Sequence, residues 1–369
     1  MNKLMIVVLT LTIILLVGCG GETITGNVVN EPIKIGVMTM TTGDVAFLGQ
    51  NIVKSAELAV EELEYDNVEL IIADVGNLGE GRNTVAAYRK LVDVDKVEII
   101  IDGMLSDGTM AVAPLLDQDE VVMITPLTGG ENIDNAAEYL FRNGPSDIIA
   151  GTKPAKQLLE FGFENVALYT DNAEYTLDIR KHFVSSFRGK IVVDEVIIPD
   201  KSDYRGELSK ITNEVDAIVI NTATGMSAPH MIKQLYELGN EKPIFVNFLA
   251  FNDNALEIAG NALENVYVYD PEFDETSSLT TMFFSQYEKK YGVKSNIPFH
   301  ATGTYDAIRM SVEAVEKVGY DGKKVHDYLL ENVQGWQGMN GVVTFDEKGN
   351  TQTGFVLKQV RNGELVMAE

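Results

Sequence analysis

The sequence of 369 residues predicts an α/β protein that contains two parallel sheets. Short apolar runs alternate with longer amphipathic segments, which is the pattern of successive βα units. The pattern occurs in two series, the first with strands between Ile33 and Pro126 and the second between about residue 147 and Asp270. Hydrophobic residues make up 45% of the chain and charged residues 23%, the proportions of a chain that folds around a packed core.

The first series contains four predicted strands, Ile33–Met40, Val68–Val75, Val97–Asp102 and Val121–Pro126. Amphipathic segments separate them. In the segment 51–65, for example, Ile52, Ala56 and Leu63 share one face at helical spacing, whereas Lys54 and Glu61 lie on the other. Such a helix is expected to pack one face on a sheet.

The second series repeats this organisation and is followed by a different C-terminal part. Its predicted strands are Asn165–Asp171, Lys190–Pro199, Ala217–Ala223, Pro243–Leu249 and Asn265–Asp270, with helices near 147–162, 174–189, 203–214 and 227–239. Three further helices are predicted over Ser277–Gly292, His300–Gly319 and Lys323–Val333. Strands with tight turns at 347–350 and 361–363 follow, because Gly and Asn there tolerate positive φ.

The N-terminus resembles the signal peptide of a lipoprotein. Lys3 precedes an uncharged run, Leu4–Val17, of about 14 residues, which is short of the roughly 20 that span a bilayer. Leu16-Val17-Gly18-Cys19 resembles a lipobox. We therefore predict a signal peptide over 1–18, a lipid on Cys19 that attaches the chain to the membrane, and a flexible tether over 19–31. Cys19 is the single cysteine, so no disulfide is expected.

The charge of the chain argues against nucleic-acid partners. The 55 acidic residues outnumber the 29 Lys and Arg, which gives a formal net charge of -26. Such a surface repels phosphate backbones and anionic lipids.

Several segments carry a resemblance to a known family. The opening 35–50, its helix from Ser55 to Glu62, the loop 103–109 and the segments 305–307 and 341–349 resemble the type I periplasmic binding proteins, in the leucine/isoleucine/valine-binding branch. The likeness covers about 33 to 367. It implies two Rossmann-like lobes joined by three crossovers, with a ligand cleft between them. By analogy, lobe 1 would hold 32–144 and 271–339, and lobe 2 would hold 145–270 and 340–369.

Two loops of lobe 1 are candidates for holding a ligand carboxylate. The loop 102–110 follows a strand and enters a helix, so Ser106 and the following amides would offer donors at a helix N-terminus. The alternative role of Ser106 is that of an N-cap. The segment after the next strand, Leu127, Thr128 and Gly129, is expected to do the same, although Gly129 stands where the family usually has threonine.

The resemblance also assigns positions in lobe 2. Tyr175 matches an aromatic residue that lines the cleft, its alternative being packing within its own lobe. Thr222 and Thr224 stand where relatives often carry an aromatic residue, which would widen the pocket. Leu249 stands where amino-acid binders of this branch place an acid for the ligand ammonium. Either a nearby acid, Asp253 or Asp270, substitutes, or the ligand lacks an amine, because a buried unpaired ammonium costs several kcal/mol.

Enzyme motifs are not found. The chain carries no GxSxG, P-loop or GxGxxG sequence, and its four histidines lie far apart. His182 and His326 are expected on helix surfaces, and His300 either packs at a helix start or lies at the hinge or cleft. We expect no catalytic residue, no cofactor and no metal site.

Together these observations predict an extracytoplasmic, lipid-anchored solute-binding protein. It would be a monomer that captures a branched-chain or other amino acid, or a related small carboxylate or amide, by lobe closure. It would then deliver the ligand to the permease subunits of an ABC transporter. The alternative is a ligand-sensing or interaction lipoprotein of the same fold that acts on a receptor or envelope enzyme.

Overall fold

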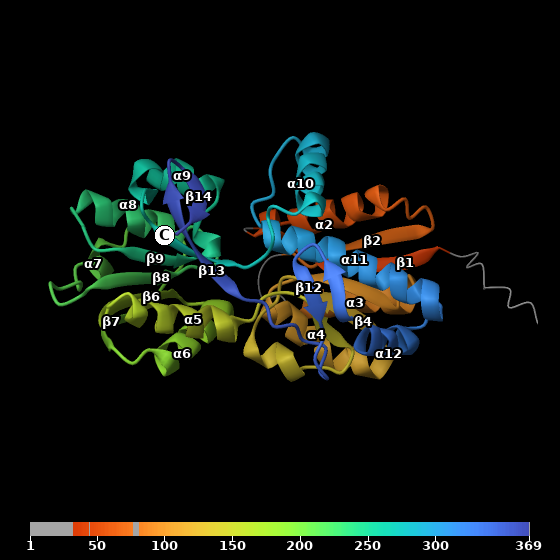
Figure 1. Cartoon of the computed structure of the whole chain (residues 1–369). Coiled ribbons are helices and arrows are strands. Elements are labelled where there is room, and N and C mark those ends of the chain that lie inside the picture. Colours follow the sequence, from red (N-terminus) through yellow and green to blue (C-terminus); the bar gives the residue numbers. More distant parts are fainter. Residues whose placement is uncertain (1–31, 44, 77–80, 369) are drawn as a thin grey trace, which may run out of the picture. The chain divides into compact units, whose positions relative to one another are not determined.

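The computed structural model describes residues 32–43, 45–76 and 81–368, apart from the side chain of Asp253. The predicted signal peptide, Cys19 and the tether lie outside the described residues. Two large sheets organise the described chain (Figure 1). The first has the order β2-β1-β3-β4-β5 and is parallel throughout; its strands are β1 (Ile33–Thr39), β2 (Val68–Asp74), β3 (Ile99–Gly103), β4 (Val122–Thr125) and β5 (Leu140–Arg142).

The second sheet has seven strands in the order β14-β13-β10-β9-β8-β6-β7. Five of them are parallel: β6 (Asn165–Asp171), β7 (Lys190–Ile197), β8 (Ala217–Asn221), β9 (Ile244–Asn247) and β10 (Tyr267–Pro271). Of the last two, β13 (Phe355–Arg361) pairs antiparallel with β10, and β14 (Glu364–Met367) pairs antiparallel with β13. The prediction of two parallel sheets is confirmed.

Helices connect the strands. Those of the first series are α2 (Ala46–Glu62), α3 (Gly81–Arg89) and α4 (Ser106–Asp119), followed by the 3-10 turn η3 (Glu131–Asn135). Those of the second are α5 (Asp147–Glu160), α6 (Glu174–Ser186), α7 (Arg205–Leu208), α8 (Ser227–Glu237) and α9 (Asp253–Ala259). After β10 come α10 (Ser278–Tyr291), α11 (Pro298–Val318), α12 (Gly322–Asn332) and the two-stranded β11 (Gln334–Gly338) and β12 (Gly341–Thr344).

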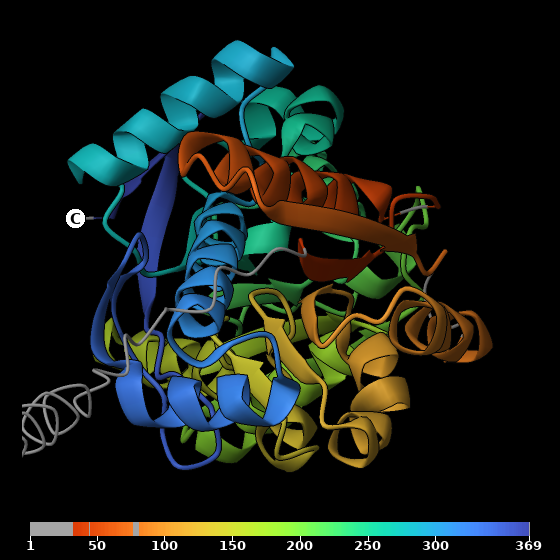
Figure 2. The same ribbon diagram turned by 90° about the vertical axis from the view of Figure 1, so that its right-hand side faces the viewer.

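The chain passes between the two sheets three times. It leaves the first sheet after β5, and after β10 it returns, because α11 packs against α2, β3 and β4. Figure 2 shows α2 and α11 side by side. The chain crosses again between β12 and β13. Each lobe is therefore assembled from separate stretches of sequence, as the resemblance implied, while the residues at the lobe boundaries remain a prediction.

Apolar packing explains why these segments form buried strands. Ile99, Ile100 and Ile101 of β3 are fully buried, as expected for a central parallel strand covered on both faces. Burial of one such side chain contributes roughly 1.5–3 kcal/mol. Gly49 of α2 allows the helix to approach the end of β1, because a Cβ atom there would lie 2.1 Å from the carbonyl oxygen of Met40.

The structure corrects some expectations for individual elements. The predicted helix 203–214 is only the short α7, and the helix predicted from His300 begins at Pro298. The prediction that His182 and His326 lie on helix surfaces is wrong, because only 9% and 4% of these residues is exposed. His326 stacks on Tyr139 at 4.6 Å between ring centroids, and α6, which carries His182, packs against α5.

His300 is also buried. Its ring stacks on Phe248, which follows β9, with 5.0 Å between centroids. Burial lowers the pKa of His300 to about 3, so its ring is neutral at ordinary pH. Of the two roles left open, this environment favours packing at the helix start. Among the described residues, no helix is long and apolar enough to cross a membrane.

Candidate functional site

The carboxyl ends of the two sheets face a shared pocket. In each sheet the order of the strands reverses beside the first strand, which is β1 in one sheet and β6 in the other. Ligands of open α/β sheets bind at such reversal points. The lining residues come from segments attached to both sheets: Met40, Val75, Thr84, Met104, Leu105, Ser106, Asp107 and Gly108 on one side, and Ala173, Glu174, Tyr175 and Ala223 on the other. Ser106 and Tyr175, both predicted from the sequence, are thus brought to one pocket.

Ser106 is the first residue of α4 rather than its cap. The N-cap position is Leu105, and no side chain caps this helix. Within the described chain the Ser106 hydroxyl has no hydrogen-bond partner, although only 4% of the residue is exposed. The amides of Ser106 and Asp107 also have no acceptor among the described residues. The capping alternative is therefore not adopted, and three donors at a helix N-terminus are available to an anion.

A buried carboxylate fixes the loop that carries Ser106. Asp102 accepts hydrogen bonds from the Met104 amide at 2.8 Å and from the Thr109 hydroxyl at 2.6 Å. Burial raises the pKa of Asp102 to about 6, against the opposing effect of these hydrogen bonds. The Thr39 hydroxyl, at the end of β1, donates to the carbonyl of Gly103 at 2.7 Å. These contacts tie the loop to two strands.

The segment after β4 contributes backbone rather than side chains. The Thr128 hydroxyl donates to the Met104 carbonyl at 3.0 Å, so it is engaged within the protein. A Cβ atom on Gly129 would lie 2.5 Å from the carbonyl oxygen of Pro145, which requires glycine there. The amides of Gly129 and Gly130 have no acceptor among the described residues, and a Cβ on Gly130 would lie 3.1 Å from Ser106 Oγ. Leu127 is buried in the core of the first sheet.

Tyr175 forms the facing wall of the pocket. It lies in the first turn of α6 and is half-buried. Burial, together with the nearby charge of Asp147, raises the pKa of its phenol well above the usual range, and a hydrogen bond with Asn247 opposes this only in part. The ring therefore offers an apolar face and a protonated hydroxyl.

The other three predicted residues of lobe 2 lie beside the pocket without lining it. The Thr222 hydroxyl donates to Asp171 at 3.1 Å, and the Thr224 hydroxyl donates to Asp200. Leu249 is 6% exposed and belongs to the hydrophobic cluster around the first sheet. Ala223, between the two threonines, lines the pocket instead. The role of these residues, and of Ser106 and Tyr175, as ligand contacts stays a prediction.

One of the two alternative partners for a ligand ammonium is already occupied. Asp270 forms a buried ion pair with Lys358 at 2.6 Å, at β13. The side chain of Asp253 is outside the described residues. Sequence reasoning also missed the apolar lining, namely Met40, Met104, Leu105 and Ala223. Their position directly after strands β1, β3 and β8 was the signal that could have identified them.

The rim of the pocket joins segments that follow the two sheets. The Glu131 amide donates to Asp178 at 2.7 Å, and the Asn132 side chain donates to Glu174 at 2.9 Å. A further hollow runs along this rim between Ser106 and Lys181. These contacts hold α6 against η3 around the pocket.

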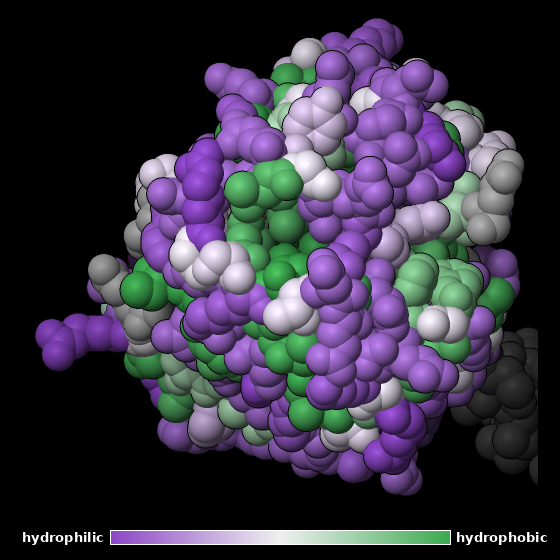
Figure 3. Space-filling view, turned by 90° about the vertical axis from the view of Figure 1, so that its left-hand side faces the viewer, coloured by the Kyte–Doolittle hydropathy of each residue, from purple (hydrophilic) through white to green (hydrophobic). Residues whose placement is uncertain are grey.

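A different pocket lies at the amino ends of β9 and β10, where Ile244 and Tyr267 contribute to its lining. Figure 3 shows one face of the molecule, on which hydrophobic residues gather in a hollow among hydrophilic ones. Ligands of open α/β sheets bind at the carboxyl ends of the strands, so we do not assign the ligand site to the amino-end pocket.

Comparison with known proteins identifies similar chains. The sequence profile of a family described as periplasmic binding protein matches residues 32–364. The Leu/Ile/Val-binding protein BraC3 of Rhizobium johnstonii is 24% identical over 91% of this chain and 94% of its own. The Leu/Ile/Val-binding protein of Escherichia coli K12 is 21% identical over 91% of this chain and 92% of its own.

Solved structures give the same result for the fold. The Streptococcus pneumoniae substrate-binding protein LivJ, in complex with isoleucine, superposes with a TM-score of 0.82 at 25% identity, over 92% of this chain and 99% of that one. A Rhodopseudomonas palustris solute-binding protein in complex with benzoate has a TM-score of 0.80 at 19% identity, over 91% and 95%. The predicted two-lobed fold is confirmed. The relatives are binding proteins, which confirms the prediction that the chain is not an enzyme.

Proposed function

Because the chain belongs to the periplasmic binding protein family, we propose that it is a lipid-anchored receptor for a small apolar carboxylate. It captures the ligand between its lobes outside the cytoplasm and delivers it to the permease of an ABC transporter. The lipid on Cys19 keeps the protein at the membrane surface where the permease is located.

The unengaged donors at the start of α4 carry this proposal. The Ser106 hydroxyl and the amides of Ser106 and Asp107 lie together at the start of α4, and no acceptor among the described residues meets them. A ligand carboxylate would accept these hydrogen bonds and gain from the helix dipole. Gly130 lies beside Ser106, since a Cβ there would be 3.1 Å from Ser106 Oγ, so its amide would add to the same anion site.

The remaining lining suits an apolar ligand body. Met40, Val75, Met104 and Leu105 face Tyr175 across the pocket. Leu249 provides no carboxylate at the place where the resemblance expects one, and Asp270 is paired with Lys358. We therefore infer a ligand that does not depend on a buried ammonium. Benzoate bound to the Rhodopseudomonas protein is a ligand of this kind, whereas isoleucine bound to LivJ carries the ammonium.

A matched panel of ligands tests the proposal. Isothermal titration calorimetry on refolded, ligand-free protein would compare isoleucine with 3-methylpentanoate, which lacks only the ammonium group. It would also compare benzoate with benzamide, which lacks the negative charge. We expect the carboxylates without ammonium to bind and benzamide to bind far more weakly. Tighter binding of isoleucine than of its deaminated analogue would overturn the inference about the ammonium. No binding by any member of a wide panel of carboxylates would overturn the proposed function.

A further inference from the structure

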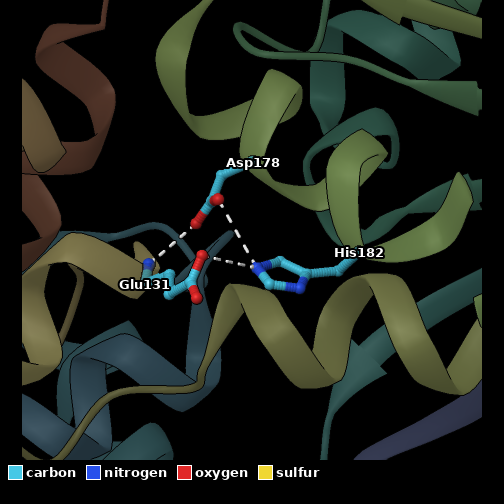
Figure 4. A group of neighbouring side chains, drawn as sticks. All are labelled: Glu131, Asp178 and His182. Carbon is cyan, nitrogen blue, oxygen red and sulfur yellow. Dashed lines mark hydrogen bonds and ion pairs between the residues drawn. The ribbon is translucent and has the colours of Figure 1, made fainter. Parts of the chain in front are cut away.

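Three potential metal ligands converge beside the pocket. Glu131 lies in η3, whereas Asp178 and His182 lie one helical turn apart on α6. Figure 4 shows the three side chains pointing toward one another. His182 Nε2 lies 3.4 Å from Glu131 Oε2 and 3.5 Å from Asp178 Oδ1. The three donor atoms all lie within 4.8 Å of one another.

The two separations from His182 match donors that share one ion. Zinc bonds to His nitrogen and carboxylate oxygen are about 2.0–2.2 Å, so two donors of a tetrahedral site lie about 3.3–3.6 Å apart. A direct hydrogen bond between an imidazole and a carboxylate would be about 2.7–2.9 Å. The two distances from His182 are longer than such a hydrogen bond, although they lie within ion-pair range, and they equal the spacing of two donors around a common ion.

The ring nitrogen of His182 is an independent sign of a missing partner. The residue is 9% exposed, and its Nε2 atom is buried without a hydrogen bond. Buried polar side-chain atoms are rarely left unpaired. The backbone at His182 is held firmly, because a Cβ on Gly151 of α5 would lie 2.7 Å from His182 Cβ. His182 Nε2 therefore faces two carboxylates, with which it forms only long ion pairs.

We propose that Glu131, Asp178 and His182 bind one divalent transition-metal ion, with water completing a tetrahedral site. Zinc is the ion best matched to one imidazole and two carboxylates at this spacing. Asp178 uses Oδ1 for the ion, while its Oδ2 continues to accept the Glu131 amide at 2.7 Å. That second hydrogen bond orients the carboxylate, as partners of metal ligands commonly do.

Lys181 competes with the ion. Its ammonium pairs with Glu131 and lies 3.9 Å from Asp178 Oδ1. Since its side chain is 61% exposed, it moves away into water without disturbing the core. Removal of this ammonium should therefore strengthen metal binding.

The ion would connect segments that belong to different sheets. Glu131 follows β4 of the first sheet, and the other two ligands follow β6 of the second. Glu131 and Asp178 line the rim that Ser106 and Tyr175 also line. A bound ion therefore favours the arrangement in which the pocket is closed. This coupling rests on the proposed function, whereas ion binding itself does not. Ion and carboxylate ligand would raise each other's affinity by the same factor.

Titration with Co²⁺ tests the site directly, since tetrahedral Co²⁺ absorbs strongly in visible light and Zn²⁺ displaces it. The full chain with Cys19→Ser excludes the single thiol as a ligand. We expect Glu131→Gln and His182→Ala each to weaken binding by more than the ~10-fold typical of losing an outer-sphere partner. Lys181→Met should strengthen binding, and His230→Ala, a histidine on α8, should leave it unchanged.

The partly exposed Glu131 keeps the test valid if His182→Ala fails to fold, since Glu131→Gln leaves the core intact. Absence of a saturable tetrahedral spectrum, or equal Co²⁺ affinity in Glu131→Gln and the parent, would overturn the proposal. If metal binds but does not change the affinity of the carboxylate found in the ligand panel, only the coupling between the two sites is refuted.

Discussion

Replacement of Ser106 by alanine separates ligand binding from folding. In the described structure the Ser106 hydroxyl bonds to no protein group, so its removal leaves no buried partner unsatisfied. We therefore expect the free energy of unfolding to change by less than about 0.5 kcal/mol, as for substitutions that break no contact. The substitution should instead lower the affinity for the ligand.

The size of that loss follows from the chemistry of the contact. A hydrogen bond to a charged group contributes about 1.5–3 kcal/mol. Because about 1.4 kcal/mol corresponds to a tenfold change in affinity, Ser106→Ala should weaken carboxylate binding roughly 10- to 150-fold. The Ser106 amide remains and continues to donate, which is why binding should not vanish.

Calorimetric titration with the carboxylate found in the panel measures this loss, and urea unfolding of the same samples measures stability. Ser209→Ala is the matched control, because its exposed hydroxyl donates only to the Gly206 carbonyl, in and after α7. Unchanged affinity in Ser106→Ala would refute the placement of the carboxylate at α4. An equal loss in Ser209→Ala would show that the effect is not local to the pocket.

Three further predictions concern stability. Gly129→Ala should destabilise the protein by about 1–3 kcal/mol in urea unfolding, because its Cβ would lie 2.5 Å from the carbonyl oxygen of Pro145. Lys358→Met should cost about 3–5 kcal/mol at neutral pH, since it leaves Asp270 buried and unpaired, and the cost should shrink at acidic pH as Asp270 takes up a proton. Burial raises the pKa of Asp306 to about 7 in the folded protein. Its contribution to stability is therefore complete below its ordinary pKa of 3.8 and is lost as pH rises toward 7. Asp306→Asn should flatten this fall in the free energy of unfolding between pH 3.8 and 7.

Controls for these variants lie on the surface. Gly206→Ala places a Cβ where no atom lies within 4 Å, and should not destabilise the protein. Lys348→Met removes an exposed lysine and should change the unfolding free energy by less than about 0.5 kcal/mol. If Gly129→Ala were as stable as Gly206→Ala, the close approach at Gly129 would be wrong. A pH profile of Asp306→Asn that parallels that of the parent would show that another group titrates.

Much of the fold was predictable because local patterns report local structure. Alternating apolar and amphipathic segments identified the strands of both parallel series except the three-residue β5, which is too short to show a period. The periodicity did not predict how the chain passes between the two sheets, and this prediction came from the family resemblance. The burial of His182 and His326 depends on tertiary contacts, of α6 with α5 and of the His326 ring with Tyr139, which local periodicity does not report.

For the site, position after a strand was the informative signal. Ser106 and Tyr175 line the pocket, as the sequence predicted. Thr222 and Thr224 instead form hydrogen bonds within the protein, and Ala223 between them lines the pocket. A single residue of register decides which side chain faces a ligand, and sequence alone does not fix it. The group formed by Glu131, Asp178 and His182 was missed because Glu131 lies 47 residues before Asp178.

The three passages of the chain between the sheets also constrain the order of folding during synthesis. Helix α11 is buried along most of its length, with Ala301, Ala307, Ile308 and Val312 fully enclosed, and it covers α2, β3 and β4. Until residue 318 has emerged from the ribosome, the apolar surface that this helix covers is exposed to water. The first sheet, although made first, is therefore completed only after all five parallel strands of the second sheet have been made. A nascent chain that stops before α11 should be the species most dependent on chaperones and most easily degraded by proteases.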